Sequence, residues 1–156
     1  MKDVLIALEA LTGCDPDRRD LAAEVLGDFL RGAMLDTATA CLVVGRLINL
    51  AVIESVVKVR ESALNAVSEA FDHYSLPLGL VEPLASAART LEPELLEYAL
   101  HIFGATQDPR ARSLIEPFLH HPDPNVREEA RLAYAEVAMS ATLGHGSPWS
   151  GRSIPS

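Results

Sequence analysis

The sequence predicts an all-α protein built from stacked helical hairpins. Hydrophobic residues make up 49% of the chain and aromatic residues only 5%, so alanine and leucine carry most of the apolar content. That composition suits helices that pack closely on other helices. Short turns marked by proline, aspartate or glycine separate the helical patterns. We therefore expect a right-handed α-α superhelix of about four hairpins, followed by an irregular C-terminal tail.

The positions of the turns place the individual helices. Proline at a first helical position loses no hydrogen bond, and an aspartate before it can cap the exposed N–H groups. Asp15, Asp108 and Asp123 are expected to act in this way, and Gly104 suits a chain reversal at a helix end. The expected helix pairs are Asp3–Thr12 with Asp17–Arg31, Asp36–Ile48 with Ala51–Asp72, Pro77–Thr90 with Pro93–Phe103, and Pro109–Leu119 with Asn125–Thr142.

The second pair has the least marked boundary. Between Ile48 and Ala51 only Asn49 is a turn former, so the segment 36–72 is either two helices or one long bent helix. Apolar residues surround the helix over 41–57 instead of forming a stripe, which indicates a segment covered on both sides.

A change in composition divides the chain into a repeat domain, residues 1–142, and a tail, residues 143–156. The tail is rich in glycine, serine and proline and has no periodicity, so we expect it to be mobile in isolation. It carries Trp149, the single tryptophan of the chain, which could anchor the tail in a partner's groove.

The net charge of −9 bounds the choice of partner. Nucleic acids and anionic membranes need lysine and arginine facing phosphate, so an acidic chain argues against both and favours a basic protein. Cys14 and Cys41 form no CxxC motif, which fits a cytoplasmic protein without disulfides. The segment before Cys14 looks like a bacterial lipobox, but Glu9 interrupts the apolar run that a signal peptide requires.

Several turns and helix starts repeat along the chain. D-P-x-x-R occurs at 15–19 and 123–127, V-R-E-x-A at 59–63 and 126–130, and L-V-E-P-L at 80–84 matches L-I-E-P-F at 114–118. Together with A-L-x-x-x-G-x-x-x-D-P-R-A at 99–111, these motifs resemble HEAT repeats of the short bacterial type first noted in phycobilisome lyases.

The resemblance is specific over about 40 residues, 96–137, and partial over 1–32 and 52–104. It implies a superhelix whose second helices line a concave surface. It also implies that the aspartate and arginine of the turn stabilise stacking between repeats, as in Asp15–Arg19 and Asp123–Arg127. The third pair has Leu96 where the arginine is expected.

Helix geometry predicts which residues line the concave surface. With Val126 in the core, Glu128 lies about 200° around the helix and points outward. The repeat alignment carries that position to Glu97, Glu61 and Asp20, so four carboxylates are expected to form an acidic ladder. The residues expected to bind a partner are Asp20, Glu24, Glu61, Asn65, Glu94, Glu97, His101, Glu128 and Trp149.

The expected function is non-catalytic protein binding. The most specific form of this expectation is an immunity or inhibitor protein that covers the basic site of a partner such as a nuclease toxin. The alternative is a scaffold or assembly adaptor that binds through apolar patches or the Trp149 tail. No metal or cofactor is expected, because His120-His121-x-Asp123 lies in a turn without a second ligand cluster. A HEAT-type DNA glycosylase would need a basic, aromatic groove, and a bilin lyase a nucleophile in a pocket, so both enzymes are disfavoured.

Overall fold

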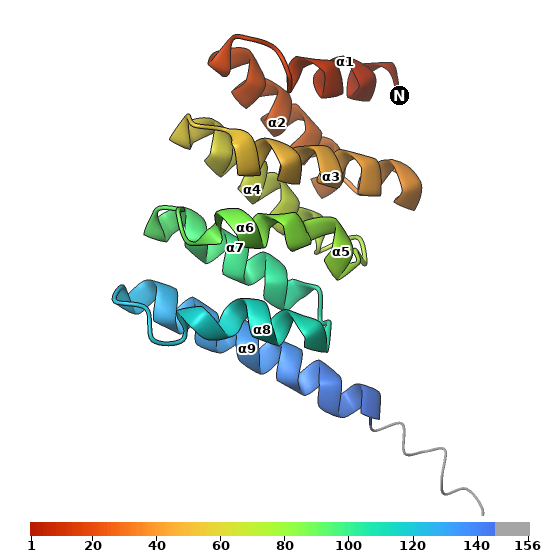
Figure 1. Ribbon diagram of the computed structural model, residues 1–156. Coiled ribbons are helices and arrows are strands. Elements are labelled where there is room, and N and C mark those ends of the chain that lie inside the picture. Colours follow the sequence, from red (N-terminus) through yellow and green to blue (C-terminus); the bar gives the residue numbers. More distant parts are fainter. Residues whose placement is uncertain (146–156) are drawn as a thin grey trace, which may run out of the picture.

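The computed structural model describes residues 1–145 and shows two layers of helices (Figure 1). One layer holds α2 (Pro16–Arg31), α4 (Val57–Ala70), α7 (Pro93–Ala105) and α9 (Pro124–His145), each packed on the next. The other holds α1 (Lys2–Ala10), α3 (Thr37–Ile53) and two interrupted helices. Apolar side chains between and within the layers form one continuous core. The predicted all-α fold of stacked hairpins is confirmed.

Proline interrupts the first helix of the third and fourth hairpins, which we had predicted to be continuous. The third contains α5 (Leu78–Val81), the 3₁₀ helix η1 (Glu82–Leu84) and α6 (Ala85–Ala88). The fourth contains η2 (Pro109–Ala111), α8 (Arg112–Ile115) and η3 (Glu116–Phe118). Pro83 and Pro117 each lie in a 3₁₀ segment, because the proline ring removes a donor and clashes with the preceding turn.

The predicted aspartate caps are present. The Asp15 carboxylate accepts a hydrogen bond of 2.9 Å from the Asp17 N–H, and the Asp123 carboxylate accepts one of 2.8 Å from the Asn125 N–H. Asp108 caps the fourth hairpin through the Arg110 N–H at 2.9 Å. These contacts satisfy donors that the helix itself leaves unpaired.

The second hairpin contains two helices, and the break lies at residues 54–56 instead of at Asn49. Glu54 leaves the helical region at the end of α3, and its carboxylate accepts a hydrogen bond of 2.9 Å from the Val56 N–H. The same carboxylate receives Arg19 at the start of α2, with Nε–Oε1 at 2.7 Å and Nη2–Oε2 at 3.1 Å. A contact between distant residues therefore helps set a boundary that no glycine or proline marks.

Arg19 stabilises stacking between hairpins as the resemblance implied, whereas the hydrogen bonds of Arg127 stay within its own turn. Arg19 also donates to the Gly13 carbonyl at 2.9 Å, so it joins the first turn to the second hairpin through Glu54. Arg127 donates to the carbonyls of its own turn, His121 and Pro122, both at 2.9 Å. In the third hairpin Leu96 is buried in the core, where an apolar side chain needs no such partner.

Gly104 does not end its helix, contrary to our expectation. It lies inside α7, buried against α9, where an added Cβ would be 2.9 Å from the Cα of Ala133. The reversal after α7 uses Gln107, which has a positive φ of 56°. Gly104 therefore permits the close approach of two helices, and a non-glycine residue adopts the left-handed conformation.

Candidate binding groove

Two neighbouring cavities lie along the layer of second helices. The first has a volume of about 390 Å³ and lies between α2 and α4. The second, also of about 390 Å³, is lined by residues of α4, α7 and α9. Glu61 and Tyr98 line both cavities, so the two are adjacent. We call the pair the acidic groove; its charged lining residues are Glu24, Asp28, Arg31, Glu61, Glu69, Glu94, Glu97, His101 and Glu129.

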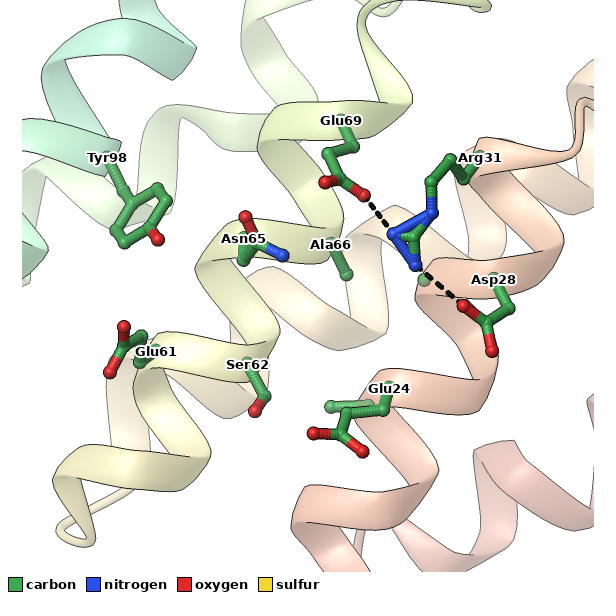
Figure 2. A pocket seen from close by; sticks show the side chains of 11 residues that line it. Glu24, Asp28, Arg31, Glu61, Ser62, Asn65, Ala66, Glu69 and Tyr98 are labelled. Carbon is green, nitrogen blue, oxygen red and sulfur yellow. Dashed lines mark hydrogen bonds and ion pairs between the residues drawn. The ribbon is translucent and has the colours of Figure 1, made fainter.

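In the first cavity an arginine already forms ion pairs with two of the carboxylates. Arg31 contacts Asp28 at 2.6 Å on its own helix and also binds Glu69 on α4 (Figure 2). Figure 2 shows Glu24 and Glu61 reaching the same cavity from facing helices, without an ion pair to the other residues drawn. In this cavity Glu24 and Glu61 are therefore the carboxylates without an ion pair to Arg31.

In the second cavity a histidine faces a carboxylate of the next helix. The Nδ1 atom of His101 on α7 lies 3.6 Å from Oε1 of Glu129 on α9. Glu129 raises the pKa of His101, and the negative charges of Glu136 and Asp72 act in the same direction against partial desolvation. The groove therefore contains a cation whose charge depends on pH near neutrality.

We expect the pKa of His101 to lie above its ordinary value of 6.5. Because the folded pKa is raised, the imidazolium stabilises the folded chain fully below pH 6.5, and this contribution is lost as the pH rises through the folded pKa. An NMR titration of the ring protons measures it. In Glu129→Gln the midpoint should fall toward the ordinary value, and an unchanged midpoint would contradict the pairing.

The groove disfavours the ionised form of the Glu97 side chain. Desolvation raises its pKa most, and the charges of Glu129, Asp123 and Glu94 raise it further. The folded chain therefore holds this carboxylate near other carboxylates without a compensating cation strong enough to reverse the shift. Groups perturbed in this way are concentrated at functional sites, although structural networks also perturb pKa values.

We expect Glu97→Gln to stabilise the folded chain at pH 7. A raised folded pKa means that ionisation of Glu97 favours unfolding once the pH exceeds its ordinary value of 4.5. The melting temperature of the variant should exceed that of the wild type at pH 7, and the difference should shrink toward pH 4. Equal melting temperatures at pH 7 would show that the groove imposes no strain on this carboxylate.

The structure brings together most of the residues predicted for the concave surface. Glu24, Glu61 and Asn65 line the first cavity, and Glu94, Glu97 and His101 line the second together with Glu61. Trp149, also predicted to bind a partner, lies outside the described residues, as does the tail beyond residue 145.

Asp20 is not free to bind a partner as predicted. Its carboxylate accepts a hydrogen bond from the Ser62 hydroxyl on α4 and lies 3.6 Å from Nζ of Lys58, with only 13% of the side chain exposed. On α2 the ladder position therefore faces the next hairpin, where we had predicted that it faces solvent.

Glu128 also lies apart from the acidic groove. It pairs with Arg131 on the same helix and lines a separate depression with Arg127. Within residues 1–145 no hairpin follows α9, so this ladder position has no facing helix. The next residue, Glu129, faces His101 instead and was missed because the single-helix projection ignored the neighbouring helix.

The turn that contains His121 and Asp123 has a structural role. His121 accepts a hydrogen bond of 3.0 Å from the Asp123 N–H, so this turn orders the start of α9.

Among the described residues no group of three or more histidine, cysteine or acidic side chains could hold a metal ion. Cys41 is partly buried, whereas Cys14 is exposed. No helix within residues 1–145 has the length and apolarity needed to span a membrane.

Comparison with known proteins shows the fold alone. No family model and no curated protein matches the chain. Among solved structures it is similar to an engineered protein, Northeast Structural Genomics Consortium target OR329, with 18% identity and a TM-score of 0.63 over 88% of this chain and 63% of that one. It is also similar to engineered target OR497, with 14% identity and a TM-score of 0.58 over 98% of this chain and 44% of that one.

These likenesses, with the stacked hairpins, define a helical-repeat scaffold. The chain spans less than two thirds of the length of either solved structure.

Proposed function

We propose that this chain is a non-catalytic protein-binding module whose acidic groove receives a basic segment of a partner protein. The observation that carries the proposal is the convergence of carboxylates from α2, α4, α7 and α9 on two adjacent cavities. The raised pKa of Glu97 supports it, because a cation bound there would relieve a repulsion present in the free chain.

The groove offers a chemically defined place for lysine or arginine. Glu61 and Tyr98 line both cavities, so a side chain crossing between them would meet a carboxylate and an aromatic ring together. An ammonium or guanidinium group is attracted by both. Carboxylates along the groove would also steer a basic partner and speed association at low salt.

The most specific form of the proposal is an immunity or inhibitor protein that covers the basic site of a toxin such as a nuclease. The chain is small and carries a net charge of −9, which suits the neutralisation of a basic surface. The resemblance of the sequence motifs to short bacterial HEAT repeats is compatible with this role. We also propose that the protein acts in the cytoplasm.

A charge-reversal comparison tests the proposal. Wild type, Glu61→Lys/Glu97→Lys and Glu82→Lys/Glu116→Lys are used as bait in a lysate of the native cell, and retained proteins are identified by mass spectrometry. The third protein is a matched control, because Glu82 and Glu116 are exposed, lie in the first helices of their hairpins and give the same change in charge. We expect a basic protein to be retained by wild type and control and lost from the groove variant. Equal retention by all three would contradict the groove as the binding surface.

The alternative proposal, a scaffold or adaptor that binds through apolar patches or the tail, predicts different results. Binding would then resist added salt, whereas an electrostatic complex weakens as the Debye length shrinks. Deletion of residues 143–156 would abolish a complex anchored by Trp149. A bilin-lyase-type enzyme would instead purify with a coloured chromophore, and a glycosylase-type enzyme would release a base from DNA.

A further inference from the structure

A second surface, at the end of the stack formed by α1 and α2, is apolar and uncovered. Ile6 on α1 and Leu21 on α2 are 56% and 59% exposed. A cavity of about 560 Å³ lies between the two helices, lined by the apolar residues Ile6, Ala7, Ala10, Leu21, Ala22 and Val25. We call this surface the α1–α2 face. Contiguous apolar surface of this kind marks an interaction site more often than an ordinary solvated surface.

Repeat alignment shows what the α1–α2 face is shaped to contact. Leu21 occupies the helix position of Ser62 in α4 and of Glu129 in α9. Ser62 donates to Asp20 of the preceding hairpin, and Glu129 pairs with His101 of the preceding hairpin. Leu21 thus lies at a position that elsewhere contacts a neighbouring hairpin, yet it is 59% exposed. The helices α1 and α2 lie at one end of the described stack (Figure 1).

The opposite end of the described stack does not complement this face. The depression at the start of α9 is lined by Arg127, Glu128 and Arg131 together with Leu119 and Pro124. Such a charged end resembles the polar outer face of a terminal repeat. Head-to-tail stacking would place these charges on apolar Leu21, which disfavours an open chain of copies.

The rim of the α1–α2 face is complementary to itself. Asp3 on α1 and Arg18 on α2 line the same cavity and carry opposite charges. Arg18 is 82% exposed, and its ion pair with Asp15 is long, at 4.0 Å. In an isologous interface centred on the cavity, each copy would present both Asp3 and Arg18 to the other copy.

We propose that the α1–α2 face binds the same face of a second copy of this chain, forming a two-fold symmetric dimer. Ile6 and Leu21 of each copy bury their apolar surface against the other copy, and the two Asp3–Arg18 pairs fix the orientation. This interface is independent of the acidic groove and of the partner proposed for it.

Sedimentation equilibrium of the full chain between about 1 and 200 μM tests the dimer, since a small apolar interface gives a concentration-dependent mass. The mass should approach twice 16.8 kDa and stop there. Leu21→Glu should raise the dissociation constant at least about tenfold, because it places a charge in the apolar centre. The matched control Leu132→Glu, at a position 55% exposed on α9, should leave it unchanged. Circular dichroism verifies that both variants are folded.

Charge exchange at the rim tests the two-fold arrangement. Asp3→Arg and Arg18→Asp should each weaken the dimer, and the double variant should regain the wild-type dissociation constant. Glu61→Lys/Glu97→Lys should retain the dimer mass even if it loses every groove partner, which separates this proposal from the proposed function. A monomer at all concentrations, a mass that rises beyond the dimer, equal effects of Leu21→Glu and Leu132→Glu, or no recovery in the double variant would each overturn the proposal.

Discussion

Replacing Glu54 with alanine should lower the free energy of unfolding by about 3 kcal/mol, since removal of one partner from a buried ion pair leaves the other charge uncompensated. Only 3% of the Glu54 side chain and 16% of the Arg19 side chain are exposed. The variant loses two hydrogen bonds from Arg19 and the one from the Val56 N–H. Urea unfolding at pH 7, with the slope unchanged, measures the loss.

Two comparisons sharpen this prediction. In Asp17→Ala an exposed ion pair with Lys58 is removed, and stability should barely change. In Arg19→Met/Glu54→Met both charges are replaced by apolar side chains, and stability should exceed that of Glu54→Ala. If Asp17→Ala costs as much as Glu54→Ala, the burial of the Arg19–Glu54 pair is not what stabilises the turn.

The pH dependence of the Glu54 effect has a definite sign. Arg19 lowers the pKa of Glu54 in the folded chain, so its contribution is present above the ordinary value of 4.5 and is lost as the pH falls through the lower folded value. The difference between wild type and Glu54→Ala should therefore narrow in acid.

Gly104→Ala should destabilise the chain by about 1 to 3 kcal/mol, even though alanine is ordinarily the better helix former. The new Cβ would lie 2.9 Å from both Cα and Cβ of Ala133, so α7 and α9 must move apart. Gly79→Ala is the matched control, because Gly79 lies in α5 with nothing within 4 Å of an added Cβ. That variant should gain about 0.5 to 1 kcal/mol. A stabilised Gly104→Ala would contradict the close approach of the two helices.

Gly104→Ala should also change the pKa of His101 in the acidic groove. His101 precedes Gly104 on α7 by about one turn, and Glu129 precedes Ala133 on α9 by about one turn. Separation of the helices should lengthen the contact between His101 and Glu129, which is 3.6 Å in the wild type. The NMR-measured pKa of His101 should then fall in Gly104→Ala and stay unchanged in Gly79→Ala.

Local signals were enough to predict the hairpins but not every boundary. Asp15, Asp108 and Asp123 cap helices as predicted, because capping depends on residues within one turn. The break at Glu54 could not be predicted in the same way, because it involves Arg19, 35 residues earlier. Gly104 was misplaced for a related reason: its role is contact with α9, which local sequence does not reveal.

The residues that line the acidic groove could be predicted only in part, again because local sequence does not reveal contacts between helices. Projection around a helix identified Glu61 and Glu97, which do line the groove. It failed at Asp20, whose carboxylate binds the next hairpin, and at Glu128, which pairs within its own helix. A side chain that points outward from one helix can still point toward the next helix of the stack. Contacts with that helix decide which side chains remain exposed to a partner.

The dissociation constant of the retained basic partner, measured for wild type and Glu61→Lys/Glu97→Lys, tests the central claim most directly. At about 50 mM salt the variant should bind at least ~100-fold more weakly, and wild-type binding should weaken markedly by about 500 mM as screening increases. The control Glu82→Lys/Glu116→Lys should bind nearly as the wild type does. Equal affinity of wild type and groove variant at low salt would contradict the acidic groove as the surface through which this chain acts.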